Sequence, residues 1–397
     1  MDFTKLKNFL DLMVEENRTP GCAVVVCIGG KPVYKYAAGV SDIDTKSALT
    51  GDEYFNIYSC SKIATVTAAA QLLERGDFLL NDPLYDYIPE FRHMMIRSEN
   101  GGLVEAKNPI TIGDLFSMSA GFDYNGNSPS LAAMKREKGN SFSTIDFARA
   151  IAGEPLYFEP GTHWQYSLCH DVLGGLVSVI TGKKFRDYVK ENIFDPLGMT
   201  QSVYHHTPEI EAKMASQYRF VPYNSANKEL DIVKAQINGM GGEGCFENVG
   251  LEVSSKGGNF PEYDSGGGGI TTTVSDYAKL VAALSCSGLG ANGERILEPR
   301  TVELMKTNRM NETQLKDMTW KQLRGYGYGL GVRTHIDKAR SGSIANIGEF
   351  GWCGAAGSTV IMDTQERLGL FFVQHTLNPR EEWYHPRLRN IIYSCID

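Results

Sequence analysis

A serine and a lysine three positions apart, Ser59 and Lys62, stand at the start of an apolar helical stretch in this chain. Behind them, apolar positions such as Val66 and Leu73 recur at helical spacing, and Gly76 is a typical C-terminal cap. Residues three apart share one face of a helix, so the Lys62 ammonium can reach the Ser59 hydroxyl. The free N–H groups of a helix start also favour a negative charge there. The spacing therefore predicts a serine nucleophile with an amine that handles its proton.

The same pattern can arise by chance, and the chain contains a second copy at Ser225–Lys228. Glu229–Asp231 follows that copy without a long helical pattern, so we interpret it as exposed surface. A Ser-x-x-Lys tetrapeptide taken alone is more often surface than catalytic. The buried helix predicted behind Ser59 is the observation that favours a catalytic role for the first copy.

A serine–lysine pair needs a base matched to neutral pH, and Tyr166 is the strongest candidate. A tyrosine phenol is a poor base in water because its pKa is about 10. A neighbouring ammonium such as that of Lys62 favours the phenolate. Tyr166 is one of nineteen tyrosines, and without these partners it would more often be a packing residue. We therefore predict a Ser59, Lys62 and Tyr166 site.

A glycine-rich stretch, Gly348–Gly357, precedes a predicted strand and could supply a third part of the site. Its small residues would let a substrate lie against the strand edge. The backbone N–H of Ala355 could then complete an oxyanion hole with the N–H of Ser59. Read without this context, the stretch is simply a glycine-rich turn.

Strand and helix patterns at both ends of the chain enclose a helical middle. A hairpin is predicted at Gly21–Ile28 and Val33–Gly39, and a strand pair at Ser358–Asp363 and Leu368–Gln374. We therefore predict an α+β fold with a sheet packed against helices. The predicted domains are a discontinuous sheet domain of residues 1–76 and 266–397, a helical domain of residues 77–200, and an irregular, cap-like insertion of residues 201–265.

The predicted insertion is rich in Gly, Asn, Glu and Ser and has few periodic runs. A long loop-rich segment of this kind is more often a lid or a binding surface than a simple connection. It contains a G-x-G-x-x-G match at Gly239–Gly244. No helix pattern follows the match, so we reject a dinucleotide site.

The net charge of the chain is −8 and its pI is near 5.6, which argues against nucleic acid or an anionic membrane as a partner. We find neither a signal-peptide pattern nor a long apolar stretch, and we expect a cytoplasmic protein. The eight cysteines form no C-x-x-C pair or Cys/His cluster in the sequence, so we expect free thiols. We expect no metal and no organic cofactor.

Several stretches together resemble the serine β-lactamase and penicillin-binding-protein superfamily, whose motif set begins with Ser-x-x-Lys. The resemblance covers most of the chain. It implies a β-lactamase/transpeptidase-like fold, in which an antiparallel sheet is flanked by helices and joined to a mainly helical lobe. Besides Ser59–Lys62, the matching stretches are Leu79–Leu84, Ile110–Leu115, Glu159–Gly161, Trp164–Ser167, Pro196–Met199, Gly267–Ile270 and Ser275–Ala278.

Within this superfamily the chain resembles the family VIII carboxylesterases, relatives of class C β-lactamases, more than the lactamases. Leu168 replaces the Asn of the lactamase Tyr-x-Asn, and Trp352–Gly354 stands where Lys-Thr-Gly would be. The esterase branch commonly has Trp-Gly-Gly there, so Cys353 is a departure. Met118 and Ala120 replace a His and a Ser of another motif in the family, which puts the role of that loop in doubt.

The missing lysine removes a charge-assisted partner for the carboxylate of a lactam or a peptidoglycan stem. An indole instead offers a large apolar face, which suits a neutral acyl or alcohol group. We therefore expect an ester in preference to a β-lactam. The expected substrate-binding residues are Trp352, Cys353, Gly354 and Leu168.

These features predict a serine hydrolase that cleaves carboxylic esters through an acyl-enzyme, with a small-molecule ester or amide as its partner. A β-lactamase or D-peptide hydrolase on the same site is the nearest alternative. A binding or sensor protein that has kept the scaffold and lost the chemistry is a third. A conventional α/β-hydrolase is disfavoured, because the chain contains no G-x-S-x-G.

Overall fold

The fold is described from a computed structural model. The second Ser-x-x-Lys copy, Ser225–Lys228, and all but the last residue of Gly239–Gly244 lie outside the described residues. The described residues are 1–98, 100–222, 244–251 and 260–396.

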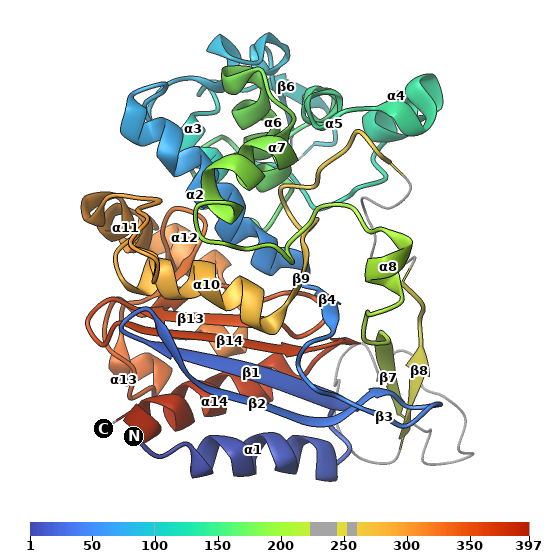
Figure 1. Ribbon diagram of the computed structural model, residues 1–397. Helices are drawn as coiled ribbons and strands as arrows, with labels where there is room; N and C mark the ends of the chain where they lie inside the picture. The colour runs from blue at the N-terminus through green and yellow to red at the C-terminus, as the bar shows by residue number, and fades with distance from the viewer. Residues whose placement is uncertain (99, 223–243, 252–259, 397) are drawn as a thin grey trace.

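A large antiparallel sheet forms the base of the molecule in Figure 1. Its eight strands lie in the order β10-β11-β12-β13-β14-β1-β2-β3, and each of the neighbouring pairs is antiparallel. The strands are β1 (Gly21–Ile28), β2 (Lys31–Asp42), β3 (Ser47–Ala48), β10 (Tyr326–Tyr328), β11 (Arg333–His335), β12 (Phe350–Gly351), β13 (Thr359–Asp363) and β14 (Leu368–Gln374).

The predicted first hairpin is confirmed as β1 and β2. β1 is almost entirely buried, in keeping with its run of Val, Ala and Cys residues. Its two-residue turn, Gly29 and Gly30, has φ values of 59° and 86°. Only glycine adopts two such values in succession without strain, and they match the twist of the flanking strands. The glycine pair therefore fixes the register of the hairpin.

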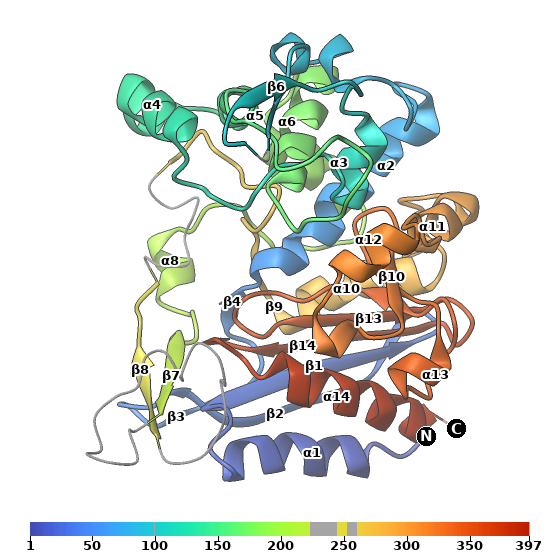
Figure 2. The ribbon, with the colours of Figure 1, turned by 180° about the vertical axis from the view of Figure 1, so that it is seen from behind.

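Helices cover both faces of the sheet (Figures 1 and 2). α1 (Thr4–Glu15) and α14 (Glu381–Ile396) lie side by side on one face, and α10 (Val274–Ser285) lies on the other. The two faces bury separate apolar cores. Phe372 belongs to the core under α1 and α14, whereas its neighbour Phe371 belongs to the core that also surrounds α2.

The helix predicted after Ser59 is confirmed as α2 (Ser61–Arg75), which ends at Gly76 with a φ of 73°. α2 is buried along most of its length, because small and aliphatic residues occupy nearly all of its faces. It leads from the sheet into the helical region that forms the upper part of Figure 1. Its first residues therefore lie between the two parts of the molecule.

The regular elements of residues 77–200 are mainly helices, and this segment also contains a short strand pair that the sequence did not indicate. The strands β5 (Met95–Arg97) and β6 (Leu103–Glu105) have three residues each, too few for a period-two pattern to be visible. The helices are α3 (Ile112–Ser117), α4 (Pro129–Lys138), α5 (Thr144–Ile151), α6 (Cys169–Thr181) and α7 (Phe185–Val189), which continues as a π-turn over Lys190–Phe194.

The segment predicted to be irregular contains ordered elements in its described part. β7 (Tyr218–Pro222) pairs with β8 (Gly244–Asn248) and with the distant β15 (Thr376–Leu377). The remaining elements are β4 (Tyr54–Asn56), β9 (Thr271–Thr273), α8 (Pro208–Glu211), α11 (Pro299–Lys306), α12 (Glu312–Asp317) and α13 (Lys338–Ser341).

Two further observations concern the cysteines and the length of the helices. All eight cysteines lie in the described part and are free thiols, as predicted. None of the helices in the described ranges combines the length and the apolar character needed to cross a membrane.

Candidate active site

Ser59 lies in a single 3₁₀ turn, Tyr58–Cys60, directly before α2. The preceding residue, Tyr58, has a φ of 45°, a left-handed conformation that is strained for a bulky side chain. The Tyr58 hydroxyl donates a hydrogen bond to Oε1 of the buried Gln217 at 2.7 Å, which holds the side chain in place. The strained turn thus presents Ser59 at the start of α2, where backbone N–H groups lack helical acceptors.

Lys62 is fully buried, and its ammonium is fixed by three acceptors. Nζ donates to Ser59 Oγ at 3.2 Å, to the Gly267 carbonyl at 2.6 Å and to the Tyr124 hydroxyl at 3.4 Å. The structure therefore brings the predicted serine and lysine within hydrogen-bonding distance.

Tyr166 lies in the same place as Ser59 and Lys62. Lys62 Nζ is 4.9 Å from the centre of its ring, and Nε1 of Trp352 donates a hydrogen bond to its hydroxyl at 3.2 Å. The Tyr166 ring stacks on Tyr124, with ring centres 5.2 Å apart and an angle of 8° between the planes. The three residues predicted from the sequence are thus neighbours in space, and their catalytic roles stay predictions.

The protonation of Tyr166 differs from the sequence expectation. Burial raises the pKa of Tyr166 above its ordinary value. The positive charge of Lys62 and hydrogen bonds with Lys62 and Ser59 act in the opposite direction but do not cancel the effect of burial. Burial thus acts against the expected effect of Lys62, which favours the phenolate. Desolvation favours the neutral phenol more strongly than the ammonium favours the anion.

Trp352 also differs from its expected role. Only 1% of its surface is exposed, so its indole has almost no face to offer a substrate. The ring packs against Tyr166, Trp320 and Tyr328, with ring centres 5.1–5.8 Å apart. Its contact with the site is the N–H donated to Tyr166. The sequence indicated a large apolar side chain, but its surroundings depend on aromatic residues that are distant along the chain.

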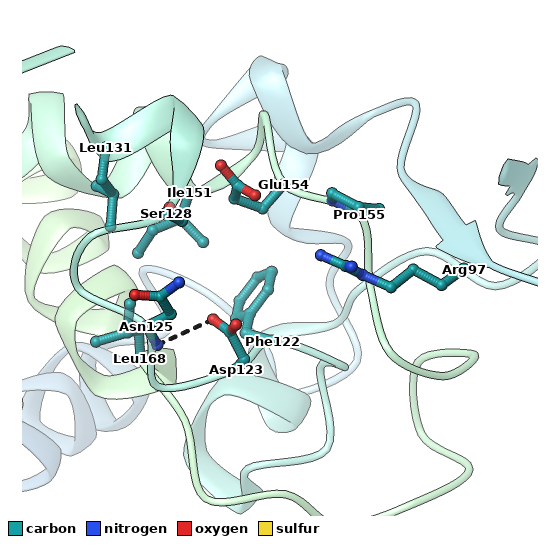
Figure 3. Close-up of a pocket in the computed structure, with 10 residues that line it drawn as sticks. All are labelled: Arg97, Phe122, Asp123, Asn125, Ser128, Leu131, Ile151, Glu154, Pro155 and Leu168. Carbon is teal, nitrogen blue, oxygen red and sulfur yellow. Dashed lines mark hydrogen bonds between the residues drawn. The ribbon is translucent and has the colours of Figure 1, made fainter. Parts of the chain in front are cut away.

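The described contacts of two other predicted binding residues involve groups other than Ser59. Cys353 is 8% exposed, and its thiol donates to Glu381 Oε2 at 3.6 Å. Leu168 lines a small cavity together with Phe122 and Asp123, and the described lining of that cavity does not include Ser59 (Figure 3). The roles of Cys353 and Leu168 in binding a substrate stay predictions.

The glycine-rich turn after Trp352 lies beside the segment that carries Ser59. A Cβ added to Gly354 would be 2.2 Å from the carbonyl oxygen of Ile57, so only glycine allows this close approach. The Ser358 hydroxyl donates to the same carbonyl at 2.8 Å. Ala355, the predicted second oxyanion donor, is exposed in this turn. The oxyanion hole itself stays a prediction.

The structure adds residues that the sequence did not single out for the site. Tyr124 contacts both Lys62 and Tyr166. It lies between α3 and α4, in a loop without a periodic pattern, so local sequence gave no signal for it. The carbonyl of Gly267 was part of a matching glycine stretch, but its bond to Lys62 is visible only in three dimensions.

A buried carboxylate holds the Gly267 segment in position. Asp171, which is 2% exposed, accepts hydrogen bonds from the Tyr263 hydroxyl, the Ser265 hydroxyl and the Gly267 N–H at 2.7–3.1 Å. A Cβ added to Gly267 would be 2.4 Å from Asp171 Oδ2. Asp171 therefore orients, through this segment, the carbonyl that binds Lys62.

The antiparallel sheet, the buried central helix and the Ser59–Lys62 pair at its start define a β-lactamase-like serine hydrolase fold. The sequence profile of the Beta-lactamase family matches residues 6–392. This chain belongs to the Beta-lactamase family of serine hydrolases, which confirms the predicted superfamily and fold class.

Relatives agree with this assignment. The chain is 28% identical to Protein Rv1367c of Mycobacterium tuberculosis over 85% of its own length and 81% of that protein. It is 26% identical to Esterase EstB of Burkholderia gladioli over 94% of its length and 90% of the esterase. Among solved structures, EstCE1, a hydrolase with promiscuous acyltransferase activity, matches with a TM-score of 0.77, 23% identity and coverage of 98% and 97% of the two chains.

Proposed function

We propose that this protein hydrolyses carboxylic esters of small molecules by two-step acyl transfer at Ser59. The observation that carries the proposal is the 3.2 Å contact between Lys62 Nζ and Ser59 Oγ, with the Tyr166 hydroxyl beside them. The likeness to a relative named as an esterase supports the choice of substrate class.

Activation of Ser59 requires one proton to leave the Lys62–Tyr166 pair. A neutral phenol and an ammonium are both unable to accept a proton from serine. Loss of one proton leaves either an amine or a phenolate, and a closely coupled pair shares that loss. The indole N–H of Trp352 favours the phenolate once it forms, because it donates a hydrogen bond to the phenolic oxygen.

The two steps then follow in order. Ser59 Oγ bonds to the ester carbonyl carbon and passes its proton to the deprotonated pair. The bond to the alcohol oxygen breaks, and the alcohol leaves with that proton. Water gives a proton to the pair, and its oxygen bonds to the acyl carbon. The bond between that carbon and Ser59 Oγ then breaks, the acid is released, and Oγ takes the proton back from the pair. N–H groups of Ser59 and Ala355 would hold the oxyanion in both steps.

The residue at the lysine position of the lactamase motif supports an ester in preference to a lactam. In the family resemblance, Trp352 stands where a lactamase has the Lys of Lys-Thr-Gly. An indole provides no positive charge for the carboxylate of a lactam, whereas a neutral ester does not need one.

Ester hydrolysis by purified protein tests the proposal. We expect turnover of short-chain p-nitrophenyl esters, and a loss of about 10⁴-fold or more in kcat for Ser59→Ala, because the nucleophile is removed. Ser225→Ala, in the second Ser-x-x-Lys copy, is the matched control and should keep full activity. Full activity of Ser59→Ala would show that another residue attacks the ester.

A second measurement separates the alternative functions. A fluorophosphonate probe should add covalently to Ser59, and intact-protein mass with peptide mapping would locate the adduct. A protein that does not label would be a binding or sensor protein. Turnover of a chromogenic cephalosporin faster than that of esters would instead favour the β-lactamase or D-peptide hydrolase alternative.

A further inference from the structure

Next to Trp352 in the sequence, Cys353 belongs to a cluster of three side chains whose types bind metal ions. Cys353, Glu381 and His385 each offer one ligand atom, and these three atoms lie within 4.8 Å of one another. Cys353 and His385 are 8% and 3% exposed, and Glu381 is more accessible. The ester hydrolysis proposed above uses none of these three side chains.

The backbone explains why the three side chains converge. Glu381 and His385 are four residues apart in α14, so they project from the same face of that helix. Cys353 lies in the segment before β13 and forms an antiparallel β-bridge with Thr359, the first residue of β13. Two ligands from a helix and one from a sheet therefore meet at a fixed junction.

The spacing suits a tetrahedral ion. Sulfur and oxygen ligands lie about 2.3 Å and about 2.0–2.2 Å from zinc, and in a tetrahedral arrangement they stand about 3.5 Å apart. Cys353 Sγ and Glu381 Oε2 are 3.6 Å apart. These two ligand atoms would thus need little movement to share one ion. A thiolate, an imidazole and a carboxylate are all ligands that zinc accepts.

Neighbouring groups hold two of the ligands in place. The Thr359 hydroxyl lies 2.6 Å from Nε2 of His385, and Gln322 Nε2 donates to Glu381 Oε2 at 3.0 Å. Second contacts of this kind fix the orientation of metal ligands in known sites. Their presence here means that the side chains are already ordered before an ion binds.

Charged groups near the cluster affect how it could hold a cation. Arg333 is paired with the buried Glu349 at 2.7 Å, which offsets its positive charge. A bound divalent ion displaces the thiol proton, so a Cys353 thiolate and a Glu381 carboxylate would balance its two charges.

We propose that Cys353, Glu381 and His385 form a binding site for a divalent ion of the zinc class, with water in the fourth position. The ion would connect the turn after Trp352 to the start of α14. Because these ligands come together only in the folded chain, zinc would bind the native state in preference to the unfolded state and stabilise it. The proposal is independent of the proposed ester hydrolysis.

Zinc binding to the full-length, chelator-treated protein tests the proposal. We expect one zinc ion per chain by native mass spectrometry and a melting temperature that rises with zinc concentration. Cys353→Ser, Glu381→Gln and His385→Gln should each weaken zinc binding by more than about tenfold, since loss of a residue that only orients a metal ligand already costs about that much. Cys395→Ser, which changes a buried cysteine outside the cluster, should bind zinc as the wild type does.

Cobalt substitution provides a readout that does not depend on whether the variants fold. Cobalt(II) bound to the wild-type protein should show the near-ultraviolet charge-transfer absorption of a cobalt–thiolate bond, and zinc should displace it. The absence of that band, or unchanged zinc affinity in a folded Cys353→Ser variant, would overturn the proposal.

Discussion

Tyr166 is subject to two opposing influences at the level of the single residue. Burial favours its neutral phenol, while the Lys62 ammonium and the Trp352 N–H favour its anion. In the proposed mechanism, Ser59 is activated only after one proton has left the Lys62–Tyr166 pair. This balance makes the rate of the proposed reaction depend on pH.

The first prediction concerns this pH dependence. We expect kcat/KM for a neutral ester to rise as pH increases from neutral into the alkaline range, because deprotonation of the Lys62–Tyr166 pair becomes more frequent. Tyr166→Phe should lower kcat/KM by about 10²–10⁴-fold, the usual contribution of a general base. Steady-state kinetics at a series of pH values with an uncharged substrate would measure both effects.

Tyr157→Phe is the matched control, because Tyr157 is an exposed tyrosine outside the site. It should reproduce the wild-type pH profile. A profile that is flat across neutral and alkaline pH, or a Tyr166→Phe variant with wild-type kcat/KM, would contradict the role given to Tyr166.

The residue scale also shows what a sequence can reveal of this site. Ser59 and Lys62 were predictable because three-residue spacing on a helix is a local property. Tyr124 was not, since its contacts with Lys62 and Tyr166 arise only from packing between loops and helices. The burial of Trp352 was not predictable either, because it depends on aromatic residues that are distant along the chain.

At the scale of elements, α2 and the Gly267 segment act together. α2 supplies the Lys62 ammonium, and the segment supplies the carbonyl that binds it at 2.6 Å. Asp171 on α6 fixes that segment from behind. The position of the ammonium thus depends on a helix and a loop that are far apart in sequence.

The second prediction tests this arrangement with Gly267→Ala. The added Cβ would be 2.4 Å from Asp171 Oδ2, so the segment and its carbonyl must shift. We expect kcat/KM to fall on the order of 100-fold, as displacements of about 1 Å in a site can do. Gly126→Ala is the control, since a Cβ there meets nothing within 4 Å. Equal activity of both variants would contradict the positioning role.

The third prediction concerns His375, which follows β14 directly. Burial lowers the pKa of His375 to about 4, and its Nδ1 lies 2.9 Å from the Ala215 carbonyl oxygen. Between about pH 6.5 and about pH 4 the unfolded chain takes up a proton that the folded chain does not. The free energy of unfolding should therefore fall as pH decreases through this range, by up to about 3 kcal/mol from this group.

Chemical denaturation at several pH values would measure this effect. His375→Asn keeps a side-chain N–H and removes the titration, so its stability should depend less steeply on pH than that of the wild type. His93→Asn changes an exposed histidine and should leave the slope unchanged. Identical slopes for wild type and His375→Asn would show that His375 does not carry the effect.

Elements were predictable where a repeating pattern was long enough. β1, β14 and α2 contain runs that show their period and burial, so their existence followed from the sequence. β7 and β8 were missed because their pairing partners lie in different parts of the chain, including β15. Their five-residue runs gave no alternation strong enough to mark them as strands.

At the scale of the whole molecule, the large sheet separates two cores with different relations to the site. Phe371 packs on Tyr277 at 4.8 Å, and the Tyr277 hydroxyl donates to the Cys60 carbonyl at 2.6 Å, next to Ser59. Phe372 points to the opposite face and packs on Tyr384 at 5.4 Å. Consecutive residues of one strand thus belong to a core near the site and a core remote from it.

The fourth prediction compares Phe371→Ala with Phe372→Ala. Both side chains are fully buried, so each truncation should lower the free energy of unfolding by about 3–5 kcal/mol. Only Phe371→Ala should also lower kcat of the folded enzyme, because its cavity releases Tyr277 and the turn that carries Ser59. Denaturation curves and kinetics below the melting temperature would separate the two effects. Equal kcat values for the two variants would contradict this division.

The pairing of β1 with β14 joins Cys22 to Gln374 in the middle of the sheet. During synthesis, the early hairpin can form at once, but its inner edge has no partner until the strand near residue 370 has left the ribosome. Contacts between such distant parts of a chain make folding slow, and an open apolar edge invites association with other chains. We therefore expect newly made chains to need protection by chaperones until β14 has paired with β1.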